Sequence, residues 1–413
     1  MIDQFLSDSP SASAVAEAQP VRRPRIFLAW RQMTREKTRL VVAILGITFA
    51  ALLMMVQLGI RDALFDSATL LHRSLAGEVF LMSPHSASVI AAQPFSDRRL
   101  DQAQSLPEVA GVSGVYVAFA QWENHRTHTA RNLYVIGVDP DQPVLDLEGF
   151  RNHRHALKQS DTVLFDEYSR PEFSTDEVVS DLERRMPVAT EMSPIAGRLR
   201  RVTVAGTFKL GPTFGGDANV ITSDLNFRRL FPARRKGTID IGVVRLTPGA
   251  DPERAIARLR ALLPADVRVM SRDEFQEIDR SYWASSKPLG YIFNLNVAMA
   301  FLVGSIIVYQ ILYTDVSEHL AEYATLKAIG YTDGALWWVV LQEAFLLAVF
   351  GFLPGFALAS AAHLGINNAT HLPIAMTPAR ALSVLALTLT MCLIAGSLAV
   401  RRLRHADPAD IFK

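Results

Sequence analysis

The sequence is poor in cysteine and in net charge, and each shortage excludes a class of protein. The single cysteine, Cys392, lies among apolar residues, so no intramolecular disulfide is available and a small packing role is favoured. The formal net charge is only +1, and no basic stripe with interleaved aromatic residues occurs. Nucleic acid is therefore not an expected partner.

The sequence motifs of common catalysts are also missing. There is no G-x-S-x-G, no H-E-x-x-H and no pair of cysteines. The glycine-rich stretch 211–216 lacks the Lys-Ser/Thr of a phosphate-binding loop, so we interpret it as a turn or a partner-binding loop. Four clustered histidines match no metal-ligand spacing and are interpreted as solvated loop residues: His125, His128, His153 and His155. We expect no catalytic residue, no metal site and no directly bound cofactor.

Four long apolar segments are the main positive feature of the chain. Residues 40–60 carry no charge and, as a helix, span about 31 Å, which matches a bilayer core of about 30 Å. A long interval of soluble composition follows, and then three further segments at 291–314, 335–358 and 381–400. The expected fold is a membrane protein with four transmembrane α-helices (1+3) and a large mixed α/β extracytoplasmic domain between the first and second helices.

The distribution of basic residues predicts the orientation of these helices. Before the first segment the basic residues outnumber the one acid, Glu36, and they are Arg22, Arg23, Arg25, Arg31, Arg35, Lys37 and Arg39. Arg401, Arg402 and Arg404 follow the last segment. Both termini are therefore expected in the cytoplasm, with the chain in the inner (plasma) membrane. The N-terminal stretch has no signal-peptide pattern and is interpreted as a tail with an amphipathic interfacial helix.

These features divide the chain into nine segments, alternating between membrane helices and the parts that join them. In order they are 1–39 (cytoplasmic tail and interfacial helix), 40–60 (first membrane helix), 61–290 (periplasmic α/β domain of two subdomains), 291–314 (second helix), 315–334 (cytoplasmic helix and loop), 335–358 (third helix), 359–380 (periplasmic loop), 381–400 (fourth helix) and 401–413 (cytoplasmic tail).

Runs rich in β-branched residues predict the strands of the 61–290 domain. They lie at 78–82, 114–120, 133–138, 162–165, 201–208, 219–222 and 239–246. Helices are expected at 65–76, 173–185, 251–263 and 272–283. The third of these has a capping Asp251 followed by Pro252. Together with strands at 242–246 and 267–270 it indicates a small β-α-β module, packed on a second subdomain at about 110–231.

The 315–333 connection breaks the charge rule, because it carries four acids and one Lys327. Good helix formers over 317–330 end at Gly330. Glu318 and Glu322 lie four residues apart and therefore share a face, where they repel each other unless a positive partner faces them. The alternative is an ordinary solvated helix.

Three residues of the third segment are candidates for function. Glu343 places a carboxylate at membrane depth, where it is costly and often functional. It is otherwise a snorkelling residue or the structural partner of a polar group such as Gln310. Pro354 and Gly355 can kink or hinge the helix, and simple close packing is the alternative.

The C-terminal tail repeats a helix-start signal, with Asp407 as cap and Pro408 in the first turn. It predicts a short cytoplasmic helix, and a basic tail without a helix is the alternative.

The chain resembles the FtsX/MacB class of ABC-transporter permeases, and within it the DevC family. The resemblance is carried by five motifs: WRQMTREKTRL (30–40), QLGIRDALFDS (57–67), EYATLKAIG (322–330), LQEA (341–344) and DPA (407–409). It covers nearly the whole chain beyond about residue 25, and the tail before it stays unassigned.

This resemblance implies a homodimeric, non-catalytic permease that exports glycolipid or another amphiphile. Its implied partners are a cytoplasmic ABC ATPase that binds ATP and Mg, a periplasmic adaptor (membrane-fusion) protein, a TolC-like outer-membrane channel and membrane lipid. Residues 317–330 would then include the coupling helix that seats in the ATPase, with coupling residues Glu318, Glu322, Tyr323, Leu326, Lys327 and Gly330.

Two alternatives remain open. One is an FtsX-like mechanotransducer that controls a periplasmic hydrolase without transport. The other is a membrane-anchored sensor or enzyme that has no ATPase.

Overall fold

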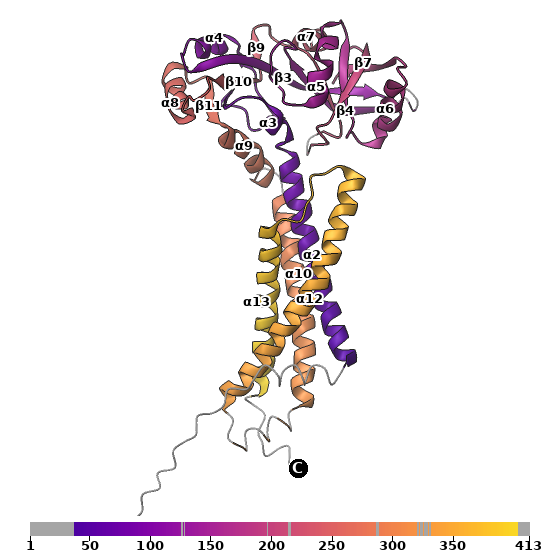
Figure 1. Ribbon diagram of the computed structural model, residues 1–413, viewed down its shortest axis with the longest axis vertical. Coiled ribbons are helices and arrows are strands. Elements are labelled where there is room, and N and C mark those ends of the chain that lie inside the picture. Colours follow the sequence, from indigo (N-terminus) through magenta and orange to yellow (C-terminus); the bar gives the residue numbers. More distant parts are fainter. Residues whose placement is uncertain are drawn as a thin grey trace, which may run out of the picture. The chain divides into compact units, whose positions relative to one another are not determined.

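Four long helices carry the apolar segments, and they follow the expected order of one helix, an α/β domain and three helices (Figure 1). They are α2 (Lys37–Ser67), α10 (Leu289–Glu318), α12 (Asp333–Thr370) and α13 (Pro378–Leu403). Each is long and apolar enough to cross a membrane. The expected fold class is confirmed at this level.

The computed structural model describes residues 37–403 apart from 125–126, 128, 196, 214–215, 286–288, 320–321, 323–324, 326–328 and 330–331. The chain divides into two compact units. The first comprises Met1–Ala50, Phe301–Pro354 and Leu385–Lys413. The second comprises Ala51–Ala300 and Gly355–Val384, and so contains the whole α/β domain.

Two of the helices are longer than their apolar segments. α2 has 31 residues and is about 46 Å long, and α12 has 38 residues and is about 57 Å long. The prediction of a loop at 359–380 is therefore wrong in its bounds. α12 runs to Thr370, and only residues 371–377 connect it to α13. The stretch after residue 358 is rich in alanine, which favours helix.

Small residues bring the helices of the first unit together. A Cβ added at Gly351 would lie 2.5 Å from the Ile47 side chain, and one added at Gly304 would lie 2.7 Å from that of Ala50. Glycine therefore lets the backbones approach closely, as is common between membrane helices. The surrounding core is apolar and consists of Ala43, Ile47, Ala50, Val308, Leu312, Ala344, Leu347, Ala348, Met391, Cys392, Ala395 and Ala399. It contains the single cysteine, as expected.

The second unit is built on a nine-stranded sheet of order β11-β1-β10-β3-β4-β8-β5-β7-β6, beside a two-stranded sheet of β2 and β9. The strands are β1 (Val79–Met82), β2 (Phe95–Ser96), β3 (Val109–Glu123), β4 (Ala130–Val138), β5 (Thr162–Asp166), β6 (Val188–Pro194), β7 (Arg200–Phe208), β8 (Asn219–Ser223), β9 (Thr238–Ile239), β10 (Ile241–Leu246) and β11 (Arg268–Ser271). The expected β-α-β module is present, with β1 between its strands β10 and β11.

The longest strand, β3, takes part in both halves of the large sheet. Residues 109–115 pair with β10, residues 115–123 pair with β4, and residues 120–123 also pair with β6. Because β6 is the last strand of the order, the pairings from β3 through β4, β8, β5, β7 and β6 close into a ring. β3 is therefore shared by two groups of strands: it pairs with β10 of the group β11-β1-β10, and it belongs to the ring with β4, β8, β5, β7 and β6.

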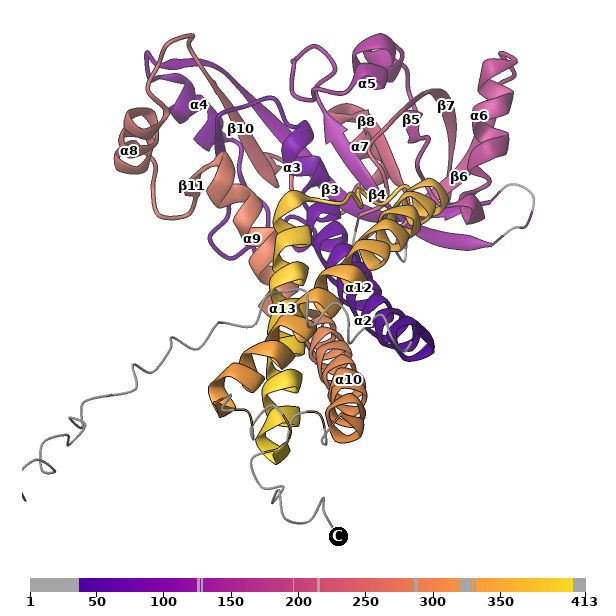
Figure 2. The same ribbon diagram turned by 60° about the horizontal axis from the view of Figure 1, so that its bottom comes forward.

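Short helices cover both faces of this sheet (Figure 2). The faces are distinct because side chains alternate along a strand, so that Val79 and Leu81 join one apolar cluster and Phe80 and Met82 join the other. The first cluster includes residues of α4 (Arg98–Gln104), α6 (Thr175–Glu183), α7 (Asp224–Leu230) and α8 (Pro252–Leu262). The second includes residues of α3 (Leu70–Ser74), α5 (Glu148–His153) and α9 (Arg272–Ser285).

Local capping fixes the starts of α8 and α9. The Asp251 carboxylate accepts a hydrogen bond from the Glu253 N–H at 3.0 Å, as the sequence predicts for α8. At α9, Ser271 and Glu274 form a reciprocal capping box, with N–H to side-chain distances of 3.2 and 2.9 Å.

The expected strand 239–246 is interrupted at Asp240, which is fully buried. Its carboxylate accepts the Val117 N–H at 2.8 Å and pairs with Arg234. The chain consequently changes sheets here, since β9 pairs with β2 and β10 pairs with β1 and β3. Burial raises the pKa of Asp240, and the Arg234 guanidinium opposes that shift.

We predict that Asp240→Ala lowers the free energy of unfolding by about 3–5 kcal/mol, because it leaves the partly buried Arg234 guanidinium and the buried Val117 N–H without their acceptor. The matched control is Asp266→Ala. The Asp266 carboxylate is half exposed and lies 2.7 Å from the Arg99 guanidinium, so its loss should cost less than about 1 kcal/mol. Urea unfolding in detergent measures both. Equal losses would contradict the structural role of Asp240.

A second prediction concerns the pH dependence of α9. The Ser271 N–H, and then Arg260, hold the pKa of Glu274 below its ordinary value. A lowered folded-state pKa gives stability above the unfolded pKa of about 4.3 that is lost as pH falls through the folded value. Glu274→Gln should therefore lower the unfolding temperature at pH 7, with the difference from the native protein shrinking below about pH 4. Ser271→Ala should lower it without that convergence.

Candidate functional site

The end of α10 is joined to the start of α2 by an ion pair. Glu318 Oε1 lies 2.7 Å from Arg39 Nη2, and their side chains are 48% and 25% exposed. An exposed pair of this kind contributes about 1 kcal/mol or less. Part of the acidic charge near the α10–α12 connection is therefore balanced within the chain, by a residue 279 positions away.

The other predicted coupling residues are placed only in part. Glu322 is helical and exposed. Outside the described residues lie Tyr323, Leu326, Lys327, Gly330, Asp407 and Pro408. Their assigned roles stay predictions.

Glu343 is buried in the first unit, with only 2% of its surface exposed. Its carboxyl group lies beside that of Asp315 on α10. Gln310, the example given for a polar partner on a neighbouring helix, lies on the exposed face of α10, and Asp315 of the same helix is the neighbour instead.

His319 completes this group of titratable side chains. Its Nδ1 lies 3.0 Å from the Asp315 carbonyl oxygen and 3.7 Å from the Asp315 carboxylate. Asp315 lies on α10, His319 directly follows that helix, and Glu343 lies on α12. The functional role of Glu343 stays a prediction.

Pro354 and Gly355 lie in the middle of α12, which continues through both. The boundary between the two compact units falls between them. One turn earlier, the Thr48 hydroxyl donates to the Gly351 carbonyl at 3.0 Å, where the backbones of α2 and α12 are in close contact. Gly351 therefore serves close packing, and a hinge at Pro354 and Gly355 stays a prediction.

An ionic layer in the second unit joins three helices, and sequence reasoning missed it. Arg380 of α13 is only 7% exposed and meets the Asp62 carboxylate of α2 at 2.9 and 3.2 Å. Asp62 also accepts from Arg61, which in turn donates to Asn294 of α10 at 3.2 Å. The sequence position of these residues could have indicated the pair, because Asp62 lies just after one charge-free run and Arg380 just before another.

The α12–α13 connection contacts the α/β domain. The His371 ring stacks on Tyr168 with a centroid distance of 4.6 Å and an interplanar angle of 11°. Nearby, Asp166 is fully buried and accepts the N–H groups of Leu210 and Gly211 at 3.0 and 2.9 Å. Burial raises the pKa of Asp166, against the effect of the Asn219 amide and these N–H groups.

The glycine-rich stretch that starts at Gly211 is a turn, as one interpretation held. The backbones of Thr213 and Gly216 exchange hydrogen bonds of 3.0 and 3.2 Å. Gly211 has a φ of +98°, a conformation that favours glycine. Its Gly211 end is anchored to Asp166, and residues 214–215 lie outside the described residues.

The clustered histidines do not form a metal centre in the described part of the chain, where no group of three ligand-type side chains is placed to hold an ion. His153 ends α5 and His155 lies in the following 3-10 helix (Arg154–Lys158). Both are exposed, but on helices instead of the expected loop. His125 and His128 lie outside the described residues.

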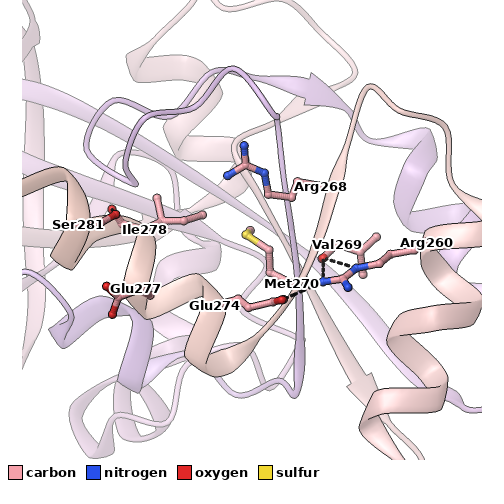
Figure 3. A pocket seen from close by; sticks show the side chains of 8 residues that line it. All are labelled: Arg260, Arg268, Val269, Met270, Glu274, Glu277, Ile278 and Ser281. Carbon is pink, nitrogen blue, oxygen red and sulfur yellow. Dashed lines mark hydrogen bonds and ion pairs between the residues drawn. The ribbon is translucent and has the colours of Figure 1, made fainter.

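An open pocket of about 320 Å³ lies at the β11 end of the sheet (Figure 3). Its lining comes from α8, β11 and α9 and consists of Arg260, Arg268, Val269, Met270, Glu274, Glu277, Ile278 and Ser281. Arg260 donates to the Val269 carbonyl at 3.0 Å and pairs with Glu274 at 2.8 Å. These charges serve the fold, and the pocket presents no nucleophile with an adjacent base.

Comparison with known proteins assigns both parts of the chain. A family model for the MacB-like periplasmic core domain matches residues 40–262, more than half of the chain, and a model for the FtsX-like permease C-terminal region matches residues 294–408. No curated protein sequence matches the chain.

Two solved structures show a distant likeness to about half of the chain. The periplasmic region of MacB from Actinobacillus actinomycetemcomitans covers 49% of this chain and 92% of its own, with 10% identity and a TM-score of 0.34. The extracellular domain of the ABC-type transporter YknZ from Gram-positive bacteria covers 48% of this chain and 100% of its own, with 11% identity and a TM-score of 0.32.

We predict that Asp62→Ala destabilises the protein by about 2–4 kcal/mol, because it leaves the buried Arg380 guanidinium without its carboxylate. Arg380→Met removes the buried charge itself and should cost less. The double variant should cost less than the sum of the two, by at least about 1 kcal/mol.

The control is Asp146→Ala, whose pair with Arg151 has both side chains more than 60% exposed and should contribute less than about 1 kcal/mol. Thermal unfolding in detergent provides the values. Strict additivity of the Asp62 and Arg380 variants would contradict the assigned contact.

Proposed function

This chain belongs to the FtsX/MacB-like permease family, whose members are transmembrane subunits that work with a cytoplasmic ATPase, and we propose that it is the permease of a DevC-like ABC exporter. The observation that carries this proposal is the pairing of the two family matches with a helix, α2, that runs unbroken from Lys37 into the α/β domain at Ser67.

In this proposal the chain transmits force and performs no chemistry of its own. A cytoplasmic ABC ATPase binds ATP and Mg, and closure of that ATPase moves the helices and, through them, the external domain. The cargo is a glycolipid or another amphiphile, taken up outside the inner membrane and passed through a periplasmic adaptor to a TolC-like channel. The permease is a homodimer with both termini in the cytoplasm.

Contacts at the end of α2 support this transmission. Asp66, in the last turn of α2, accepts from Arg73 of α3 at 3.0 Å and from Arg280 of α9 at 2.9 Å. One carboxylate therefore ties the membrane helix to two helices of the domain. A displacement of this end of α2 is passed to α3 and α9 without an intervening loop.

The composition of the first unit favours a mechanism in which the chain transmits force over one in which a solute passes through the helices of a single chain. Its core residues are apolar, and glycines bring its backbones into close contact. Among its described residues, the buried acidic or basic side chains are Glu343 and His319, and both lie near Asp315. An aqueous route would need many more polar side chains along the helices.

The same features fit a second candidate, an FtsX-like mechanotransducer that activates a periplasmic hydrolase. It shares the ATPase and the force-transmitting α2 but moves no cargo. The apolar core of the first unit is the observation that favours it. Partner identity separates the two functions.

The coupling residues follow from this proposal. The α10–α12 connection would be the ATPase-binding segment, with Glu318 and Glu322 as its acidic contacts. The Arg39–Glu318 pair would then hold the start of this segment against α2, so that a movement of the ATPase is passed directly to α2.

Affinity purification from native membranes tests the function. Recovery of an ATPase with an adaptor supports the exporter, and recovery of a cell-wall hydrolase in place of the adaptor supports the mechanotransducer. A preparation that contains no ATPase would contradict both.

The coupling residues have their own test. Glu318→Lys combined with Glu322→Lys should lower ATPase recovery at least about tenfold, because it reverses the acidic contact surface. Arg39→Ala is the matched control, since it removes the in-chain partner of Glu318 and keeps the acid, and it should leave recovery within about twofold. Glu253→Lys on α8 should have no effect. A double variant that recovers the ATPase normally would exclude this surface.

A further inference from the structure

Two ionic layers lie one helical turn apart on α2, just past its apolar run. Each layer consists of one carboxylate of α2 and two guanidinium groups. The members are Asp62 with Arg61 and Arg380, and Asp66 with Arg73 of α3 and Arg280 of α9. Residues four apart share a face of a helix, so the two layers are neighbours. Figure 1 shows the place, where the end of α2 lies beside α3 and α9.

The two layers together carry an excess of positive charge. Four guanidinium groups face two carboxylates, and within the described part of the chain these four form no other ion pair. A guanidinium group in a protein does not lose its proton, so the excess is permanent. Two positive charges at the end of α2 are therefore not balanced by the chain itself.

The second layer also has unused hydrogen-bond donors. Arg73 and Arg280 each donate once, both to Oδ1 of Asp66, at 3.0 and 2.9 Å. A guanidinium group has five N–H donors, so among the described residues most of those on each arginine have no acceptor. Their side chains are 46% and 41% exposed, and a ligand can reach them. In the first layer, by contrast, all three nitrogens of the buried Arg380 already donate within the chain.

The layers lie at the depth of lipid headgroups. The apolar run ends at Ile60, and Asp66 is about 9 Å further along the helix axis. The polar region on each side of the bilayer core is about 5–8 Å thick. Arg61 donates to Asn294 of α10, and Tyr291, three residues before Asn294, is 70% exposed. An exposed tyrosine is typical of the membrane–water interface.

A lipid phosphate has the charge and the acceptors that this site requires. A guanidinium group binds phosphate through two parallel N–H···O bonds. The two arginines of the second layer share one carboxylate oxygen, so they lie side by side and one phosphate can contact both. An anionic lipid also balances the excess charge, whereas a zwitterionic lipid brings its own cation.

We propose that Arg73 and Arg280 bind the phosphate of an anionic lipid, in the leaflet on the side of the α/β domain. Arg61 adds positive charge from the neighbouring layer. The phosphate joins α3 to α9 beside Asp66, at the point where α2 enters the domain. This site goes beyond the proposed function, since it does not depend on a cargo and applies equally to an exporter and to a mechanotransducer.

Lipid-dependent stability tests the site in the full-length chain in nanodiscs. In phosphatidylglycerol the unfolding temperature should exceed that in phosphatidylcholine by at least about 3 °C. Arg73→Gln combined with Arg280→Gln should reduce this difference to less than about 1 °C, because the donors are lost. Equal unfolding temperatures of the native chain in the two lipids, or an unchanged difference in the double variant, would overturn the proposal.

The matched control is Arg151→Gln combined with Arg254→Gln. It removes the same amount of charge from α5 and α8, where each arginine is exposed and pairs with one aspartate. The difference between the two lipids should stay as in the native chain. A control variant that loses the difference as fully as the Arg73 and Arg280 variant would reveal a general effect of net charge and overturn the site.

Asp66→Asn separates lipid binding from a purely structural ion pair, and it tests the site even if the double arginine variant does not fold. It removes the carboxylate that competes with phosphate for the two guanidinium groups. The difference between phosphatidylglycerol and phosphatidylcholine should then increase at least about twofold, because the lipid becomes the anionic partner of both groups. If Asp66→Asn instead lowers the unfolding temperature equally in both lipids, the proposal is overturned.

Inorganic phosphate distinguishes a lipid site from a site for a soluble anion. Added at millimolar concentration to the native chain in phosphatidylcholine, it should raise the unfolding temperature by less than about 1 °C, because no acyl chains hold it at headgroup depth. A rise as large as that given by phosphatidylglycerol would assign the site to a soluble anion and overturn the lipid.

Discussion

Hydrocarbon offers no hydrogen-bond partner to a peptide group, and the rest of this structure depends on that constraint. It requires the chain to cross as unbroken helices, and the described part of the chain has four of them. Once the helix of α2 has formed, nothing in the sequence ends it at the membrane boundary, so it continues past Arg61 and Asp62 to Ser67. The α/β domain therefore begins where this continuous helix ends.

Polar groups near and within the helices are handled by pairing. Asp62 neutralises the buried Arg380, and Glu343 and Asp315 face each other across α10 and α12. In the first unit the helices come close enough for such contacts because Gly304 and Gly351 have no side chain in the way. Close packing and polar pairing are therefore two parts of one arrangement, since neither the ion pairs nor the backbone contacts form between loosely spaced helices.

Local patterns in the sequence were sufficient to predict the helices and strands whose formation depends mainly on neighbouring residues. The apolar runs identified the four helices, β-branched runs identified most strands of the large sheet, and Asp251 identified the start of α8. The short helices α4 and α7, of seven residues each, were missed because helices of that length depend on tertiary packing and carry little signal of their own.

Most contacts of the candidate site join residues far apart in sequence, and no local pattern reveals them. Arg39 and Glu318 are separated by 279 positions and Asp62 and Arg380 by 318. The sequence analysis found Glu343 from its unusual depth and named Gln310 only as an example of a polar partner, whereas its neighbour is Asp315. Whether Gln310 or Asp315 faces Glu343 depends on the rotation of α10 about its axis. That rotation is set by the helices against which α10 packs, and the sequence of α10 alone does not reveal it.

The large sheet has a consequence for how other proteins recognise this domain. At one end, residues 191–194 of β6 pair back onto β3, so that this part of the last strand is not available to an added strand. At the other end, Arg260 occupies the Val269 carbonyl of β11, which would otherwise accept a hydrogen bond from an added strand. Strand addition, a common way for a peptide to dock on a sheet, is thereby hindered at both ends. The side chains on the surrounding helices and loops are the larger surface that this domain offers for recognition.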